Sequence, residues 1–196
     1  MMNREMCIES ASVDIAKDSQ LQKKRMYTYK MLSVAFSYPD KDFFEFFPEL
    51  MPGKESLIRE YDRLFRTKEI WLYGTEYTSE HEFQRSNNLS DIAGFYKAFG
   101  LEIDNDRPDS LEAELEFMHY LIFKEIKASD KEKAQICADA QRKFFTEHLS
   151  PMAKAIAQKI IAETRNDFYK TSAGDILEFF AEEEKLILKD RPYDTL

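Results

Sequence analysis

Apolar residues recur at intervals of three and four along most of this 196-residue chain, the spacing that places them on one face of an α-helix. The most regular of these faces carries Leu111, Leu115, Met118 and Ile122. Asp40 or Asp42 is also expected to start a short helix rich in phenylalanine. The pattern predicts six or seven substantial helices with short links, over 21–37, 55–66, 89–99, 109–127, 129–148, 150–166 and 172–189.

Residues that start or stop helices stand at several of the expected boundaries. Gly100 suits the left-handed residue that closes a helix. Asp109 is expected to cap the N-terminus of the most regular helix, with Glu112 at the capping-box position. Ser150 is expected to cap a further helix, with Pro151 at its first position, where proline is favoured.

The segment 67–88 is the longest stretch without a convincing helical period. It contains Trp71, Tyr73, Tyr77 and Phe83. Its aromatic residues argue against disorder, because disordered segments are poor in them. A loop of this length in a compact domain is usually functional, so we expect an ordered, functional loop.

The composition favours an all-α fold. Val13 and Val34 are the only valines, although strands favour β-branched residues, and 5 glycines and 6 prolines are few for a turn-rich β fold. We predict a single-domain helical bundle of about seven or more helices, with a long aromatic loop and a central hinge. Residues 1–18 are expected to be a flexible segment, and 19–196 to form the domain.

The charge bounds the class of partner. The chain has 37 acidic and 28 basic residues, giving a formal net charge of −9. Such a surface repels nucleic acid and anionic lipid and suits a basic partner. No apolar run reaches the roughly 18 residues of a membrane span, and no N-terminal run resembles a secretion signal. We expect a cytoplasmic protein with neither a nucleic-acid partner nor stable membrane insertion.

Catalytic chemistry finds little support in the sequence. Glu116 and His119 have the Glu-x-x-His spacing of helical di-iron sites, but a second such motif and further inward glutamates are missing. We therefore expect a solvated His119 and no metal ligands. Glu112, Glu114 and Glu116 lie on both sides of their helix and are expected mostly on a solvated face. Without a nucleophile, phosphate-binding or dinucleotide motif, the chain is predicted to be no enzyme and to need no cofactor.

Five blocks of sequence stand in a characteristic order: REYDRLF (59–65), YGTEYT (73–78), LSDIAGFYKAFGLE (89–102), RPDSLEAELEFMHYL (107–121) and FFTEHLSPM (144–152). Together, over about residues 25–185, they resemble the TorD/DmsD family of redox-enzyme maturation chaperones. The tyrosine-rich loop and the GFYKAFG block are most similar to members that serve dimethyl-sulfide-dehydrogenase-type molybdoenzymes. The chain departs from the family at Ser110, where the hinge usually has a histidine.

The resemblance implies an all-helical cytoplasmic chaperone. Its partners would be the twin-arginine signal peptide and the apo catalytic subunit of a molybdenum-cofactor oxidoreductase, held until the cofactor is inserted. It would be a monomer or a homodimer, since some relatives exchange domains. Two alternatives stay open: a helical metal-binding enzyme that uses carboxylates and histidine, and a helical adaptor with no signal-peptide role.

A client-peptide groove is expected where the family blocks meet the aromatic loop. The hinge is expected at Pro108, Asp109 and Ser110. Tyr61 and Phe65 are four residues apart and share a helix face, although both also suit a plain core. Tyr73, Thr75 and Tyr77 alternate, so an extended loop would turn all three to one side. The predicted peptide-binding residues are Tyr61, Phe65, Tyr73, Thr75, Tyr77 and Asp109.

Overall fold

The computed structural model describes residues 2–68, 70–102 and 107–189, with side chains from residue 19 to residue 187. This part of the chain is almost entirely helical. It contains no strand, only an isolated antiparallel bridge between Tyr73 and Ser110. The predicted all-α bundle is confirmed.

Seven helices of nine or more residues build the described part. They are α1 (Met2–Ala35), α3 (Lys54–Asp62), α5 (Glu82–Ala98), α6 (Leu111–Ile126), α7 (Lys131–Phe144), α8 (Ser150–Glu163) and α9 (Asp167–Lys189). Shorter elements join them: α2 (Lys41–Phe46), the 3-10 turn η1 (Pro48–Gly53), the π-helical turns η2 (Arg63–Thr67) and η3 (Phe145–Leu149), and α4 (Thr75–Thr78).

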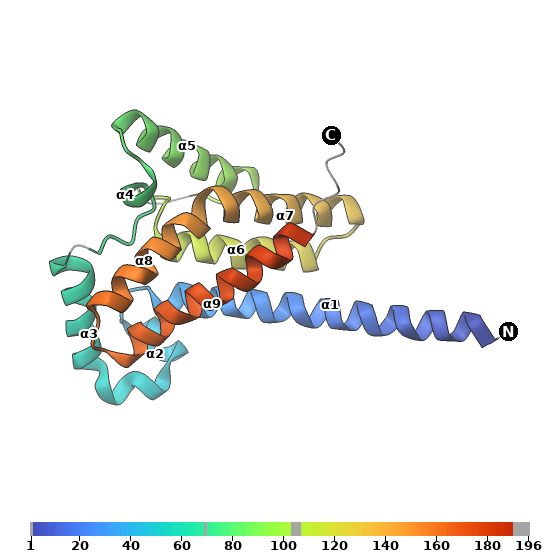
Figure 1. The fold of residues 1–196 in the computed structure, drawn as a ribbon, viewed down its shortest axis with the longest axis horizontal. Helices are drawn as coiled ribbons and strands as arrows, with labels where there is room; N and C mark the ends of the chain where they lie inside the picture. Colours follow the sequence, from blue (N-terminus) through green and yellow to red (C-terminus); the bar gives the residue numbers. More distant parts are fainter. Residues whose placement is uncertain (1, 69, 103–106, 190–196) are drawn as a thin grey trace.

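Helices distant in sequence pack side by side. α1 lies along α6, α7 packs on α6, and α8 packs on α9. Figure 1 shows α2 and α3 at the end of the bundle opposite the N-terminus, and α4 and α5 on the side away from α1. α4 contacts both α5 and α8. The segment that carries the predicted aromatic loop therefore lies on the bundle, against α8.

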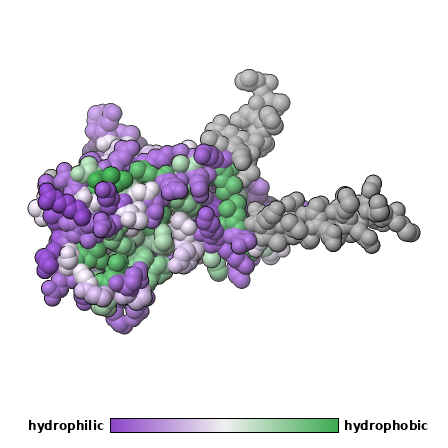
Figure 2. Space-filling model, turned by 60° about the horizontal axis from the view of Figure 1, so that its bottom comes forward, coloured by the Kyte–Doolittle hydropathy of each residue, from purple (hydrophilic) through white to green (hydrophobic). Residues whose placement is uncertain are grey.

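Aromatic side chains fill the core between these helices. Nine of them are almost completely buried: Tyr29, Phe36, Phe43, Phe44, Phe117, Phe144, Phe145, Tyr169 and Phe180. Figure 2, which brings the lower side of Figure 1 forward, shows apolar surface divided by polar side chains. No helix in the described part of the chain is long and apolar enough to cross a membrane.

α7, η3 and α8 form one continuous helical rod. The predicted cap at Ser150 is wrong, because Ser150 has helical dihedral angles and the helix runs through it. Pro151 lacks an N–H and its ring would crowd the carbonyl four residues earlier in a regular helix. The wider turn Phe145–Leu149 lies immediately before this proline, and such π-turns and prolines are where long helices bend.

Several helices begin earlier than predicted. α1 begins at Met2 and not near residue 21, and α5 begins at Glu82 and not at residue 89. The early start of α5 corrects the prediction of an irregular 67–88 segment. Only Ile92 and Tyr96 are buried in α5, so it has no continuous apolar stripe to reveal its first two turns. Residues 1–18 were predicted to be a flexible segment. Their side chains lie outside the described part of the chain, so this stays a prediction.

Two predicted helix boundaries are confirmed. Asp40 caps α2, because its side chain accepts hydrogen bonds from the backbone N–H groups of Asp42 and Phe43. Gly100 has a φ of 77°, a left-handed conformation that glycine adopts without steric cost. α5 can therefore end directly before the connection that leads to α6.

Candidate functional site

The predicted aromatic loop and the predicted hinge meet in the structure. We call residues 71–78 the strap and residues 108–110 the hinge. The two backbones pair at the bridge between Tyr73 and Ser110, which backbone hydrogen bonds of 2.8 and 2.9 Å flank. The strap is thus fastened across the N-terminal end of α6, where the hinge turns into that helix.

Asp109 is the centre of this junction and has no exposed surface. Its Oδ2 accepts hydrogen bonds from the backbone N–H of Thr75 at 2.9 Å and from the Thr75 hydroxyl at 2.7 Å. Arg107 donates to both of its oxygens, at 3.0 and 3.3 Å. The predicted cap is therefore wrong by one residue: Ser110 caps α6 by accepting from the backbone N–H of Ala113.

The carboxyl of Asp109 is held in its ionised form. Burial alone would raise its pKa, but the hydrogen bonds from Arg107 and Thr75 outweigh this and keep the pKa below its ordinary value. When the pKa of a carboxyl is lower in the folded state than in the unfolded chain, its ionised form stabilises the fold at any pH above the unfolded value. This contribution is lost as the pH falls through the folded value. The strap is consequently fastened by a charge at neutral pH.

Replacing Asp109 with alanine is expected to lower the free energy of unfolding by about 1.5–3 kcal/mol, the range for hydrogen bonds to a charged group. Urea unfolding at pH 7 and at acidic pH measures this, and the difference from the wild type should shrink as the pH falls through the lowered pKa. Asp139→Ala is the control, because Asp139 pairs with Arg142 on the surface and should cost about 1 kcal/mol or less. Equal losses in both variants would contradict the central role of Asp109.

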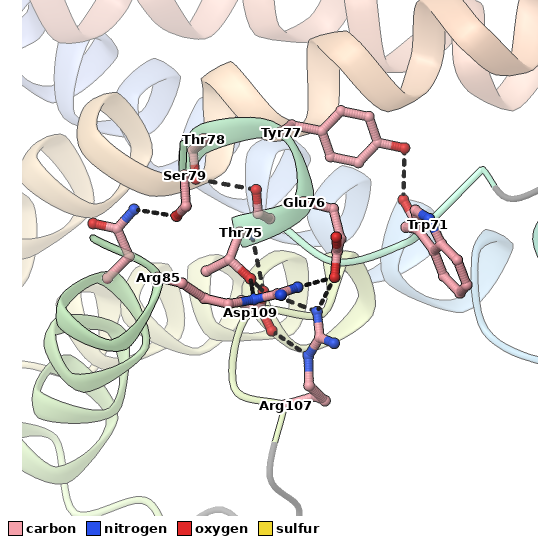
Figure 3. A network of polar contacts seen from close by, with 11 residues as sticks. Trp71, Thr75, Glu76, Tyr77, Thr78, Ser79, Arg85, Arg107 and Asp109 are labelled. Atoms are coloured by element: carbon pink, nitrogen blue, oxygen red, sulfur yellow. Dashed lines mark hydrogen bonds and ion pairs between the residues drawn. The ribbon is translucent and has the colours of Figure 1, made fainter. Parts of the chain in front are cut away.

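Charged side chains gather around Asp109, namely Glu76, Arg85 and Arg107 (Figure 3). Glu76 forms ion pairs with Arg85 and, at 3.6 Å, with Arg107. The Arg107 guanidinium lies 3.7 Å from the ring centroid of Tyr73, within the range of a cation–π contact. Carboxylates and an aromatic ring thus bind guanidinium groups here, and those groups belong to the chain itself.

Glu76, Arg85 and Arg107 were not among the predicted site residues. Their side chains are each about one-third exposed, so the network faces solvent. The available signal was their place in the sequence: Glu76 stands between Thr75 and Tyr77, and Arg107 two residues before Asp109. Arg85 carries no such signal, because it lies in the part of α5 that was predicted to be loop.

The strap is not the extended loop that the alternation of Tyr73, Thr75 and Tyr77 predicted. Thr75 and Tyr77 lie in α4, and helical neighbours two apart do not share a face. Thr75 is buried against Asp109, whereas the Tyr77 hydroxyl donates to the Trp71 carbonyl at 2.9 Å. Trp71, which was not predicted as a site residue, is 42% exposed on the strap.

Tyr61 and Phe65 divide between the site and the core. Phe65 is 7% exposed and lies edge-on to Tyr61 and to the buried Tyr169, so the core reading describes its environment. Tyr61 is half-buried, and its ring lies edge-on to the exposed Tyr38. Burial raises the pKa of Tyr61 to about 12, and Tyr73 adds to the shift. Tyr61 is therefore the more accessible of the two rings.

The burial of Glu114 contradicts the prediction that the three glutamates of α6 lie mostly on a solvated face. Its side chain is 1% exposed, and neither carboxyl oxygen has a hydrogen-bond partner. It lies beneath the strap at Gly74: a Cβ added to this glycine would be 3.4 Å from Glu114 Oε1 and 3.2 Å from Met152 Cγ. The absence of a side chain at position 74 lets the strap lie close to the carboxyl.

The residues of the Glu-x-x-His spacing serve different partners on α1. Glu116 accepts from Lys30 at 2.8 Å, and His119 Nδ1 lies 2.9 Å from the Met26 carbonyl. His119 is half-buried against α1, so the prediction that it is solvated is wrong. Among the described residues, one group could offer three metal-ligand atoms within 4.8 Å of one another, and it is a different one: Asp91, Glu147 and His148.

Comparisons with known proteins agree with this architecture. Residues 43–158 match the family model of the nitrate reductase delta subunit. The chain is 31% identical over 164 residues to a chlorate reductase assembly chaperone protein of Ideonella dechloratans, covering 76% of this chain and 84% of that protein. It is 33% identical over 93 residues to a perchlorate reductase assembly chaperone protein of Dechloromonas aromatica (strain RCB), covering 44% and 42% of the two chains.

The matched region contains the strap, the hinge and most of the helices that support them. The chain belongs to the nitrate reductase delta subunit family. Within it, the chain is a TorD-like redox-enzyme maturation chaperone, as the five sequence blocks predicted.

Proposed function

We propose that this chain is a cytoplasmic chaperone that binds the twin-arginine signal peptide and the apo catalytic subunit of a molybdenum-cofactor oxidoreductase. It would hold the subunit until the cofactor is inserted and only then release it for export. The names of its relatives, which assemble chlorate and perchlorate reductases, support an oxidoreductase of this class as the client. They also support a role in assembly over catalysis.

The observation that carries the proposal is the way in which the site binds guanidinium groups. Asp109 and Glu76 bind Arg107 and Arg85, and Tyr73 lies under the Arg107 guanidinium. A twin-arginine peptide presents two such groups. Because guanidinium recognition uses planar, paired hydrogen bonds and stacking, the client arginines can exchange with Arg85 and Arg107 on the same acceptors.

An apolar segment follows the arginine pair in such a peptide, and exposed aromatic rings on the strap and beside Tyr61 suit it. Trp71 is 42% exposed, and Tyr38, which contacts Tyr61, is 39% exposed. Aromatic rings supply large contact area at interfaces at a small cost in conformational entropy. We therefore assign the arginines to the carboxylates and the apolar segment to the rings.

Binding of a synthetic peptide that carries an Arg-Arg pair before an apolar segment tests the proposal. We expect calorimetry to show an affinity that falls with salt, because exposed ion pairs contribute about 0.2–1 kcal/mol each and are screened. It should not vanish, because the apolar segment also contributes. The matched control is the Lys-Lys peptide, which should bind several-fold more weakly. No binding of the Arg-Arg peptide would refute the signal-peptide role.

A second measurement separates the proposal from the metal-binding alternative. Asp91, Glu147 and His148 could offer three ligands on α5 and η3. Metal analysis of the purified chain should find no stoichiometric ion if the chain is a chaperone only. About one ion per chain, lost in His148→Ala, would instead favour the metal-binding alternative.

A further inference from the structure

Glu114 is a buried acid that the proposed function does not yet use. It is on the first turn of α6, next to the hinge, and its side chain is 1% exposed. Both of its carboxyl oxygens lack hydrogen-bond partners. An unpaired polar group costs about 1–3 kcal/mol when buried, so its position under the strap calls for an explanation.

The groups that cover Glu114 are apolar, negatively charged or already engaged in another hydrogen bond. On the strap the neighbour is Gly74, and on α8 Met152 packs against that glycine. On the hinge the neighbour is Asp109, and on α5 it is Tyr96, whose hydroxyl already donates to the Pro108 carbonyl. Burial, together with the negative Asp109, raises the pKa of Glu114 well above its ordinary value. Burial and the neighbouring Asp109 thus favour the protonated form of the acid beneath the strap.

The strap is held over this acid mainly by polar contacts. Only Gly74 and Thr75 are buried within it. Its polar fastening consists of backbone hydrogen bonds to the hinge, the bonds from Thr75 to Asp109 and the ion pairs of Glu76 with Arg85 and Arg107. Its apolar side chains Leu72 and Tyr77 are only partly buried against the core. Segments with little buried apolar surface open at low free energy. Lifting the strap would bring water to Glu114 and leave its carboxylate beside Asp109.

We propose that Glu114 is a latent guanidinium-binding carboxylate, which the strap covers in the free chaperone and which takes an arginine of the client when the strap lifts. The inference deepens the proposed function and rests on it. In the closed state the acid keeps its proton. When the strap lifts, the proton passes to solvent and the carboxylate accepts hydrogen bonds from the guanidinium. The paired negative charges of Glu114 and Asp109 then favour a cation at this position.

Proton release gives the inference a signature that a packing role lacks. Calorimetry at pH 7 in two buffers of different ionisation enthalpy should show up to one proton released when the Arg-Arg peptide binds. In Glu114→Gln the release should disappear and the affinity should fall at least five-fold, because glutamine mimics the neutral acid but cannot ionise. Glu112→Gln is the matched control, since Glu112 is an exposed neighbour on the same helix, and it should behave as the wild type.

Unchanged affinity and unchanged proton release in a folded Glu114→Gln variant would overturn the inference and leave the proposed function intact. Failure of the wild type to bind the peptide would instead remove the proposed function. The inference is then decided without peptide, by acrylamide quenching of Trp71, the only tryptophan and part of the strap. Quenching should rise with increasing pH in the wild type, as Glu114 ionises, and not in Glu114→Gln, and argininamide should enhance it. The inference would be overturned if quenching had the same pH profile in both proteins, or if it did not rise with pH in the wild type.

Discussion

Replacing Glu183 with alanine is expected to lower the free energy of unfolding by about 3–5 kcal/mol, because it leaves a buried arginine without its counter-charge. Glu183 and Arg25 are 2% and 5% exposed. The guanidinium donates two hydrogen bonds to the carboxylate, at 2.6 and 2.8 Å. Tyr29 donates a third to it, at 3.0 Å. The group ties α1 to α9, so its loss should be seen in urea unfolding followed by circular dichroism.

Two further variants isolate the charge pair. Glu184→Ala removes the next carboxylate on α9, which pairs with Lys154 at the surface, and it should cost about 1 kcal/mol or less. The double variant Arg25→Met/Glu183→Leu removes both charges together and should recover much of the loss, as apolar replacement of buried pairs often does. A double variant no more stable than Glu183→Ala would mean that packing, and not the unpaired charge, sets the cost.

Most of the fold could be predicted because its helices carry apolar stripes and end signals. α6 was predicted from a stripe of four residues that are all fully buried: Leu111, Leu115, Met118 and Ile122. α5 was half missed because it buries only Ile92 and Tyr96. In the first part of α5, Arg85 forms an ion pair with Glu76 on the strap. An ion pair on a polar helix face leaves no apolar periodicity in the sequence.

The sequence predicted which residues belong to the candidate site better than it predicted their conformation. Asp109, Thr75 and Tyr73 were predicted from the family blocks, and the structure brings them together. Their roles differ from the prediction because Ser110, one residue on, caps the helix instead. A cap and a buried ion-pair acceptor require the same side chain, so composition cannot distinguish the two.

Buried acids were the largest gap. Glu114 stands among Glu112 and Glu116, and Glu183 between Glu182 and Glu184. In each run one carboxylate is buried and its neighbours are partly or fully exposed. The direction of a glutamate on its helix depends on which helix packs there, and that is settled by long-range contacts. In such glutamate-rich helices, neither the buried ion pair of Glu183 nor the buried Glu114 beneath the strap could be predicted from the sequence.

Phe65→Ala and Tyr73→Ala should separate the core from the binding site. Phe65 is 7% exposed and packs on Tyr61 and Tyr169, so truncating it should cost about 3–5 kcal/mol of stability. Tyr73 is half-buried and lies under the Arg107 guanidinium. Its truncation should weaken binding of the Arg-Arg peptide by about 1–3 kcal/mol, the range of a significant interface residue.

Thermal unfolding and peptide calorimetry on the same two proteins make the comparison. Phe65→Ala should melt at a markedly lower temperature and, where it is still folded, bind the peptide nearly as the wild type does. Tyr73→Ala should melt close to the wild type, because a surface contact usually contributes about 0.5 kcal/mol or less. If Phe65→Ala instead kept its melting temperature and lost the peptide, the groove would extend to Phe65, as the spacing of Tyr61 and Phe65 first suggested. Because the structure seals Phe65 between Tyr61 and Tyr169, with little of its ring open to a ligand, we expect the peptide to reach only as far as Tyr61.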